Sequence, residues 1–337
     1  ARLAGNLKNI KAKVAPAKVM PVVKANAYGH GMLPVAKHML AHGADMLGVA
    51  ILDEGIALRQ GGITAPVLVL GGVLERQVVQ YLAHDLILAV TSLPNLLAVE
   101  EIARSLGQLA RVHLKVDTGM ARLGVPYYEA QPLLEASLRC KHVRVEGIFS
   151  HFANSDAADL THARLQIERF EQVCSFYDKR SLPTPMRHLA NSGGILALPE
   201  SYYELVRPWI MLYGSYPSAE VARSVAIRPA LTWKTQAVHV KVLPPGHPVS
   251  YGSTWQSDHP VRLLTLPVGY GDGYFRALSN KAPVIVRGKR YPQVGRVCMD
   301  QMMANLESDP AEVGEEVLLI GEASGVAITA DELAELV

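Results

Sequence analysis

Short apolar runs recur along the first two thirds of the chain, and each is followed by a polar or helical segment. Several runs are continuous in Val, Ile and Leu and do not alternate with polar residues. Continuous runs are typical of strands that are buried on both faces of a parallel sheet. We predict strands at Val19–Val23, Met46–Ala50, Pro66–Leu70, Leu86–Val90, Val112–Val116, Val143–Phe149, Met186–Ala190 and Glu204–Val206.

Segments with a helical spacing of apolar residues lie between these runs. One of them follows Ser92, which can cap its start, and ends just before Gly107. Ala163–Tyr177 has a similar pattern, and Gly43 ends a helix that starts near Pro34. Eight strand–helix units in about 210 residues predict an α/β fold, a (β/α)8 barrel of the TIM type, with a doubly wound open sheet as the alternative.

The pattern changes near the end of this region. Ile227–Leu243 alternates Thr, Val and Lys with no long helix after it, and Val261–Pro267 and Pro283–Arg287 continue as strands. These features indicate a second domain that is mainly β. We therefore predict a barrel domain at residues 1–220 and a mainly-β domain at residues 221–337.

Composition narrows the class of protein. The 337 residues are 49% hydrophobic and 19% charged, and 33 Lys and Arg against 31 Asp and Glu give a net charge of +2. This balance favours neither nucleic acid nor a membrane surface as a partner. The 12 His show no metal-ligand pattern beside an acid, so no metal is expected. Cys140, Cys174 and Cys298 form no CxxC pair, which predicts reduced thiols and a cytoplasmic protein.

Polar side chains gather where the predicted strands end. The active sites of (β/α)8 barrels lie at the carboxyl ends of their strands. The residues at or just after those ends are Lys24, Arg122, His151, Asn191, Ser192 and Arg207. The sequence therefore predicts that these side chains converge on one rim of the barrel.

Lys24 ends the first apolar run and is the most informative of the set. A lysine at the end of a buried strand must be neutralised, paired or used covalently, for instance as a nucleophile toward an aldehyde. A side chain that extends from the barrel mouth into solvent is an equally good interpretation from position alone.

The segment Val23–Gly31, with the sequence VKANAYGHG, resembles the motif that carries the cofactor lysine in alanine racemases, which use pyridoxal phosphate. Further segments resemble this family in the same order along nearly the whole chain: Val116–Gly124, Ser150–Ala153, Asn191–Gly193, Arg207–Pro208, Tyr213–Gly214, Val249–Gly252, Gly269–Gly273 and Gly295–Gln301. The resemblance implies the same barrel and β domain, and an activity that interconverts L-alanine and D-alanine to supply peptidoglycan synthesis.

The resemblance also implies roles for single residues. Lys24 would bind the aldehyde of pyridoxal phosphate and act as one base, and Tyr251 would reach in from the partner subunit of a homodimer as the opposite base. His151 would hydrogen-bond that tyrosine. The remaining implied cofactor contacts are Arg207 at the pyridine nitrogen, Arg122 at the phenolic oxygen, and Tyr28, Ser192 and the backbone N–H groups of Trp209 and Ile210 around the phosphate. His151 and Asn191 are also implied to belong to the cofactor-binding set.

Three further residues are implied on the substrate side. Met299, with Arg122, would lie near the substrate carboxylate, and Tyr270 would line the path by which the small amino-acid substrate reaches the site. In this family the position of Lys115 can carry a carbamylated lysine that orients the arginine. A buried lysine paired with an acid is an equally good interpretation of Lys115.

Elementary chemistry is consistent with this set. Racemisation exchanges a proton on both faces of Cα, which needs two bases or one mobile base. An arginine stays charged and only donates, so Arg207 would leave the pyridine nitrogen unprotonated and weaken the ring as an electron sink. Taken singly, Arg207 could instead close the last strand through a salt bridge, and Tyr251 could be a core tyrosine.

Two features of this chain depart from the family pattern. Trp209 stands where the family normally has Gly, and its indole could crowd the phosphate or point away. Family chains usually continue past the helix expected at Ala330–Leu336 into a segment with another phosphate-contacting tyrosine.

Two alternative functions stay open. They are a racemase of broader specificity, acting on serine or larger amino acids, and a protein that binds pyridoxal phosphate without catalysis.

Overall fold

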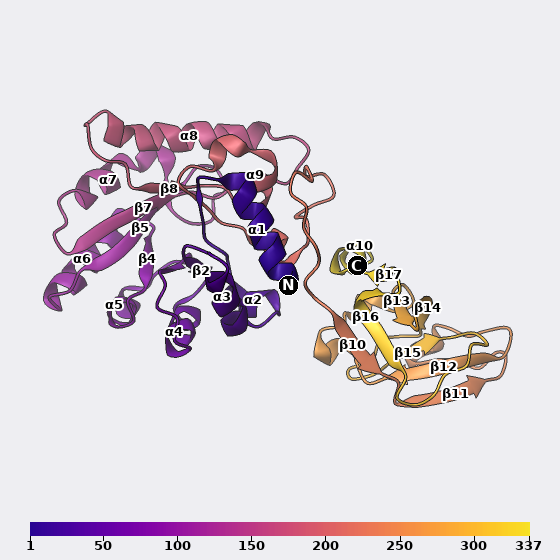
Figure 1. Ribbon diagram of the computed structural model, residues 1–337. Coiled ribbons are helices and arrows are strands. Elements are labelled where there is room, and N and C mark those ends of the chain that lie inside the picture. The colour runs from indigo at the N-terminus through magenta and orange to yellow at the C-terminus, as the bar shows by residue number, and fades with distance from the viewer. The chain divides into compact units, whose positions relative to one another are not determined.

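The computed structural model describes residues 1–337 and divides the chain into two compact units, Ala1–Arg228 and Pro229–Val337 (Figure 1). Each unit has an apolar core of its own. No helix of either unit is both long and apolar enough to cross a membrane.

Parallel strands form the framework of the first unit. They are β1 (Lys18–Val19), β2 (Leu47–Val49), β3 (Val67–Val69), β4 (Ile87–Val90), β5 (Ala110–Asp117), β7 (Val143–Phe149), β8 (Met186–His188) and β9 (Leu205–Val206). Six of them, from β2 to β8, pair in chain order, and β1 pairs with β9. The short strand β6 (Val125–Pro126) pairs with β5 at the side of this path.

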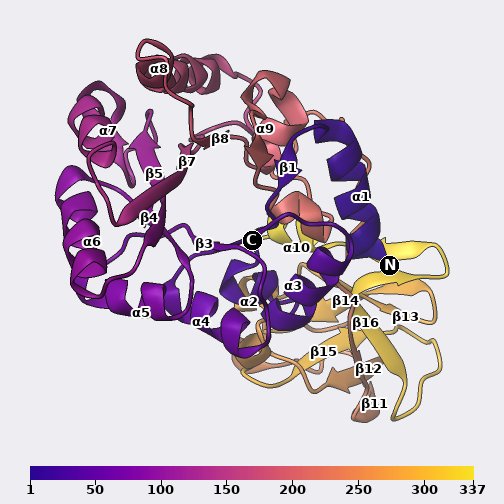
Figure 2. The ribbon, with the colours of Figure 1, turned by 60° about the vertical axis from the view of Figure 1, so that its left-hand side comes forward.

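Hydrogen bonds at two places close these strands into a ring (Figure 2). Val22, beyond the end of β1, bridges to Gly48 in β2, and the N–H of Gly48 donates to the carbonyl of Pro21 at 2.9 Å. Beyond β9, the N–H of Arg207 donates to the carbonyl of Ala190 at 2.9 Å, which joins β9 to the segment after β8. The predicted (β/α)8 barrel is therefore confirmed, and the open sheet is excluded.

Helices of the first unit pack outside the ring. They are α1 (Arg2–Val14), α3 (Met32–Ala41), α4 (Leu52–Gln60), α5 (Val78–Ala83), α6 (Leu93–Ser105), α7 (Gln131–Ser137), α8 (Thr161–Asp178) and α9 (Ser192–Ala197). Short 3-10 turns occur at Glu75–Gln77, Tyr127–Glu129, Pro199–Ser201 and Ile210–Tyr213. The Ser92 side chain accepts from the N–H of Asn95, which confirms Ser92 as the cap of α6.

The first strand is shorter than predicted. We expected Val19–Val23, and regular pairing ends at Val19. Pro21 has no N–H to donate to a ladder, so regular pairing stops there. The next residues still bond to the neighbouring segments of the ring, because the N–H of Val22 donates to the carbonyl of Pro208 and that of Val23 to the carbonyl of Gly48, at 3.0 and 2.9 Å.

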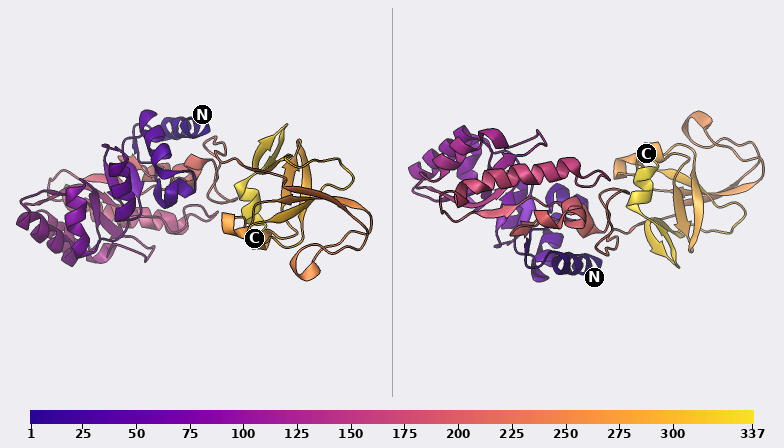
Figure 3. Two further views of the ribbon diagram at one scale, coloured as in Figure 1. Left: turned by 90° about the horizontal axis from the view of Figure 1, so that it is seen from below. Right: turned by 90° about the horizontal axis from the view of Figure 1, so that it is seen from above.

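The second unit is an antiparallel sheet (Figure 3, orange to yellow). Its main strands are β10 (Trp233–Gln236), β11 (His239–Leu243), β12 (Val261–Leu266), β13 (Pro283–Val286), β14 (Lys289–Val294), β15 (Met302–Asn305) and β16 (Glu316–Ala323), and β17 (Val326–Ile328) pairs with β16. They are ordered β10-β16-β13-β14-β15-β12-β11. The helix α10 (Ala330–Glu335) follows, and 3-10 turns occur at Tyr251–Ser253, Tyr270–Asp272 and Arg276–Leu278. The predicted mainly-β character is confirmed.

Candidate active site

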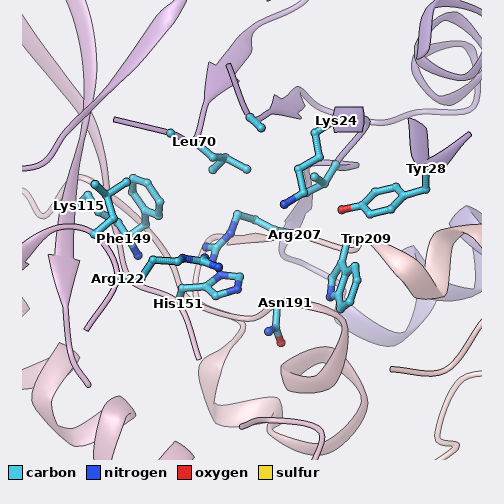
Figure 4. Close-up of a pocket in the computed structure, with 14 residues that line it drawn as sticks. Lys24, Tyr28, Leu70, Lys115, Arg122, Phe149, His151, Asn191, Arg207 and Trp209 are labelled. Atoms are coloured by element: carbon cyan, nitrogen blue, oxygen red, sulfur yellow. The ribbon is translucent and has the colours of Figure 1, made fainter. Parts of the chain in front are cut away.

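A cavity of about 470 Å³ lies at the carboxyl ends of the barrel strands. The residues that line it lie within or after seven of the strands: Val22, Lys24 and Tyr28 after β1, Ala50 after β2, Leu70 and Gly71 after β3, Lys115 in β5 with Arg122 and Leu123 after it, Phe149 in β7 with His151 after it, Asn191 after β8, and Arg207 and Trp209 after β9. Five of the six residues predicted to converge on one rim line this cavity, and Ser192 is the one that does not. Figure 4 shows the Lys24 amine and the Tyr28 hydroxyl pointing toward the middle of the space.

Lys24 begins a single left-handed helical turn, labelled α2 (Lys24–Tyr28). The φ angles of Ala25, Asn26, Ala27 and Tyr28 lie between 50° and 54°. The turn is hydrogen-bonded like a helix, since the N–H of Ala27 donates to the carbonyl of Val23 at 2.9 Å. Residues other than glycine visit this conformation singly and at a cost, so four in succession need support from the surrounding structure.

Glu54 supplies much of that support. One oxygen of its carboxylate accepts from the N–H of Ala25 at 2.6 Å, and the other accepts from the N–H of Ala50 at 2.7 Å. The Asn26 side chain accepts from the N–H of Met32 at 2.8 Å and ties the turn to the start of α3. The direction in which Lys24 enters the cavity is therefore fixed by charged and amide side chains outside the lysine itself.

Arg207 is fully buried at the floor of the cavity and holds several elements together. Its Nη1 donates to the carbonyl and to Nδ1 of His188, at 2.9 and 2.8 Å. Its Nη2 donates to the carbonyls of Ser150 and Leu189, at 2.7 and 3.0 Å, and lies 3.3 Å from Nδ1 of His151. Burial lowers the pKa of Arg207 to about 9, which leaves the guanidinium charged at neutral pH. No carboxylate pairs with it, so the predicted alternative of a salt bridge is wrong.

Arg207 also fixes the tautomers of the histidines around it. A guanidinium only donates, so Nδ1 of His188 and Nδ1 of His151 must accept, and each ring carries its proton on Nε2. His188 Nε2 lies 2.7 Å from Nδ1 of His113, which therefore accepts in turn. Burial and the nearby charge of Arg207 hold the pKa values of His151 and His188 well below their usual range, and burial lowers that of His113 to about 4. His151 is thus a neutral ring with an N–H donor on its far side.

The cavity is cationic and contains no carboxylate among its lining residues. Lys24, Lys115, Arg122 and Arg207 all line it. Burial, Arg207 and Arg122 together lower the pKa of Lys115 well below its usual range, and its Nζ lies 4.7 Å from the centre of the Phe149 ring with no ion pair. The interpretation of Lys115 as paired with an acid is therefore wrong for this structure. Buried like charges of this kind suit a ligand that carries several negative charges.

Hydrogen-bonding groups on the Tyr28 side of the cavity suit such a ligand. The Tyr28 hydroxyl is buried with no hydrogen-bond partner, and burial raises its pKa. Ser192 is buried, and its Oγ accepts from the N–H of Trp209 at 3.0 Å, while Ile210 begins the next 3-10 turn. The Trp209 indole lines the cavity 6.0 Å from the Tyr28 ring, so it does not point away from the site.

Asn191 has a different environment from the one expected. Its Oδ1 accepts from the N–H of Gly194 at 3.0 Å and from the Ser155 hydroxyl at 2.7 Å, and it caps α9. Asn191 lines the cavity, but its side-chain oxygen is engaged in holding α9 and the loop that contains Ser155.

Three predicted residues belong to the second unit and do not line this cavity. Tyr251, Tyr270 and Met299 are 70%, 43% and 61% exposed. The interpretation of Tyr251 as a core tyrosine is wrong. Tyr270 and Met299 neighbour each other, because the N–H groups of Tyr270 and Gly271 donate to the carbonyls of Cys298 and Met299.

Sequence reasoning missed three residues that shape the site. Glu54 bonds to the N–H of Ala25, next to the cavity residue Lys24. His188 and Gln166 bond to the cavity residues Arg207 and His151, which lie 19 and 15 residues away in the sequence. Glu54 stands at the third position of a helix that follows a strand, where an acid usually caps its own helix. Only its contact with Ala25 reveals the second role, and no local pattern encodes that contact.

Known proteins similar to this chain cover almost all of it. Family models described as "Alanine racemase, N-terminal domain" and "Alanine racemase, C-terminal domain" match residues 1–217 and 230–337. An alanine racemase of Carboxydothermus hydrogenoformans is 45% identical over 98% of this chain and 90% of its own length. A solved alanine racemase of Clostridium difficile has a TM-score of 0.93 at 35% identity, over 99% of this chain and 87% of that one. One from Bartonella henselae, solved with covalently bound pyridoxal phosphate, has a TM-score of 0.89 at 27% identity, over 99% and 91%.

Proposed function

Because this chain belongs to the alanine racemase family, it is an isomerase that interconverts L-alanine and D-alanine, and we propose that it does so with pyridoxal phosphate bound to Lys24. The observation that carries the proposal is the cationic cavity, with a lysine amine and an unpartnered buried phenol directed into it. When bound, pyridoxal phosphate supplies the electron-withdrawing ring that acidifies the Cα proton of an amino acid.

The residues of this cavity fit that group. Lys24 would hold the aldehyde carbon, and Arg207 would face the ring nitrogen as a donor that is charged at neutral pH. Arg122 would contact the phenolic oxygen. The Tyr28 hydroxyl and Ser192, with the backbone at Trp209 and Ile210, would surround the phosphate. Asn191 would act through the start of α9, whose backbone it holds.

Two bases would move the proton between the faces of Cα. Lys24 would serve one face, and we propose that Tyr251 of a partner subunit serves the other. The tautomer fixed by Arg207 leaves His151 with a neutral Nε2–H donor, which suits a hydrogen bond to a tyrosine oxygen that gains and loses a proton. Met299 and Arg122 would face the substrate carboxylate, and Tyr270 would line the access path. In this reading the enzyme is a homodimer with shared sites.

Lys115 is a candidate for carbamylation. The lowered pKa of Lys115 favours its neutral amine, which would add CO2 through the nitrogen lone pair and release one proton to give a carbamate anion. An anion beside Arg207 and Arg122 would be attracted to both guanidinium groups and would give Arg122 a partner. The three cysteines are free thiols, and we propose on this ground that the enzyme works in the reducing cytoplasm.

Borohydride reduction of the protein loaded with pyridoxal phosphate, followed by peptide mapping, tests the anchor. The label should be on Lys24, and a label on another lysine would refute the assignment. Rates of racemisation with alanine, serine and lysine separate an alanine racemase from one of broader specificity. Cofactor binding without any racemisation would leave only the non-catalytic alternative.

Mixing two inactive variants tests the shared site. Lys24→Ala removes the anchor but keeps Tyr251, and Tyr251→Phe keeps the anchor and cofactor binding but removes one base. If the partner supplies Tyr251, exchange of subunits creates one intact site per mixed dimer, and activity returns. No recovery after exchange has been verified by mass spectrometry would refute the sharing of Tyr251.

A further inference from the structure

Gln166 is a fully buried polar residue on α8 that does not line the cavity. Its side chain makes three hydrogen bonds to the loops that follow β5 and β7. Oε1 accepts from the N–H of Ala153 at 2.9 Å, and Nε2 donates to the carbonyl of His151 at 3.0 Å and to Thr118 Oγ1 at 3.2 Å. Every strong hydrogen-bonding direction of this amide except one lone pair is therefore used.

The orientation of this amide is dictated by its partners. A backbone N–H can only donate, so the atom near Ala153 must be the amide oxygen. A backbone carbonyl can only accept, so the atom near His151 must be the amide nitrogen. A side chain that replaces Gln166 must offer an acceptor and a donor at these two places to keep both bonds.

Gln166 and Arg207 together hold the peptide groups before and after residue His151. On one side, the carbonyl of Ser150 accepts from Arg207 Nη2 at 2.7 Å. On the other, the carbonyl of His151 and the N–H of Ala153 are bound by Gln166. The backbone of His151 is therefore fixed between the cavity floor and α8, and the direction of its Nε2–H follows from this.

The same amide reaches the loop that carries Arg122. Thr118, whose Oγ1 accepts from Gln166, precedes a turn in which Asp117 Oδ1 accepts from the N–H groups of Gly119, Met120 and Ala121, at 2.9, 3.0 and 3.1 Å. One turn later on α8, Arg169 donates to the Thr118 carbonyl at 2.9 Å. Residues of one helix thus connect the loops of His151 and Arg122.

We propose that Gln166 is a positioning residue for the racemisation reaction, which sets the Nε2–H of His151 and couples its loop to that of Arg122. This inference rests on the proposed function, because it assigns Gln166 to the step in which His151 bonds to the tyrosine base. Gln166 itself touches neither the cavity nor any reacting atom.

The length and polarity of glutamine allow two informative replacements. Methionine has a similar length and makes none of the three bonds. Glutamic acid keeps an acceptor, and when protonated it keeps a donor as well. When it ionises, its second oxygen faces the carbonyl of His151 without a proton to share, so that bond is lost, whereas the Thr118 hydroxyl can turn and donate to the carboxylate. The titratable side chains bonded within the same loops are those of Asp117, His151, His162, Arg169 and Arg207.

The experiment measures kcat and KM for alanine across pH in the enzyme loaded with pyridoxal phosphate. Gln166→Met should lower kcat roughly tenfold or more at every pH with a smaller effect on KM, against the about 100-fold that a 1 Å misplacement can cost. For Gln166→Glu, the ratio of its kcat to that of the wild type should fall as pH rises and the new carboxyl ionises. Gln172→Met and Gln172→Glu are matched controls, since Gln172 is exposed on the same helix, and they should leave kcat unchanged.

Amide hydrogen exchange gives a readout that does not depend on activity. The N–H of Ala153 bonds to Gln166 Oε1, so its exchange should accelerate in Gln166→Met and not in Gln172→Met. A normal kcat in folded Gln166→Met, or a ratio for Gln166→Glu that is flat with pH, would overturn the proposal. If Gln166→Met does not fold, the pH course of Gln166→Glu decides. If the wild-type protein protects the Ala153 amide hydrogen from exchange but does not racemise alanine, the proposed function is refuted. The positioning role of Gln166 in that reaction is then refuted as well.

Discussion

The left-handed turn after Lys24 should respond to glycine in the opposite sense from an ordinary helix. Ala25 has φ 50° and ψ 51°, and its side chain is exposed, so replacing it by glycine removes almost no buried surface. Ala12 is an exposed alanine inside the right-handed helix α1. The pair Ala25→Gly and Ala12→Gly therefore makes the same chemical change in two backbones of opposite hand.

The expected magnitudes follow from the two conformations. The left-handed region costs a residue with a Cβ about 1–2 kcal/mol, which glycine does not incur. Glycine in turn loses about 0.4–1 kcal/mol more conformational entropy on folding than alanine. Ala25→Gly should thus change the free energy of unfolding by about 0 to +1.5 kcal/mol, in the stabilising direction. Ala12→Gly should cost about 1 kcal/mol, as in other exposed helix positions.

The assay is thermal and urea unfolding of both variants and the wild type without cofactor, with circular dichroism as the signal that monitors unfolding. A difference of about 1 kcal/mol corresponds to roughly 2–4 °C in Tm for a domain of this size. Ala12→Gly should unfold at a lower temperature than the wild type, and Ala25→Gly at the same or a higher one. Equal destabilisation by both variants would refute the idea that the turn is held against an intrinsic preference.

Three further predictions concern the floor of the cavity. A Cβ on Gly147 would lie 2.6 Å from His113 Nδ1, so Gly147→Ala should destabilise the fold by about 1–3 kcal/mol, and an unchanged urea midpoint would contradict this. The pKa values of buried His113 and His188 lie below that of an unfolded histidine. As pH drops below about 6.5, the unfolded chain therefore binds protons that the folded chain does not. The free energy of unfolding should fall in that range by up to about 1.4 kcal/mol per pH unit for each ring. Urea midpoints between about pH 7 and about pH 5 check this, and a flat profile would be inconsistent with neutral buried rings. Arg207→Met removes the charge that, after burial, lowers the pKa of His151 most. NMR titration should therefore show a higher pKa for His151 than in the wild type, and an unchanged value would show that burial alone sets this pKa.

Much of the fold could be predicted because the signal is local. The continuous apolar runs marked the barrel strands, and the cap at Ser92 marked α6. In the second unit, β16 carries an equally continuous run, Val317–Ile320, which was not among the predicted strands although the signal was present. Strand ends were less predictable, because Pro21 interrupts a run whose later residues still hydrogen-bond to the neighbouring segments of the ring.

The candidate site divides in the same way. Lys24 and Arg207 were found because the barrel fold places strand ends on one rim. The left-handed turn was not, because nothing in the run Ala25–Ala27 demands that backbone, and the carboxylate that supports it lies in another helix. The contact between His113 and His188 likewise depends on the register of β5, β7 and β8, which is set by the closed barrel and not by any short motif.

The way the barrel closes has a consequence for the birth of the enzyme on the ribosome. Lys24 follows β1 and Arg207 follows β9, and regular pairing between these strands is limited to Lys18 with Leu205 and Val19 with Val206. Lys24 emerges early in synthesis, yet the floor beneath it is missing until almost all of the barrel sequence has been made. A nascent chain therefore has no complete cavity, and if the proposed cofactor site is right, retention of the cofactor would report that the first and last strands have met. Because a ligand stabilises the state that binds it, the cofactor would in turn strengthen this short pairing.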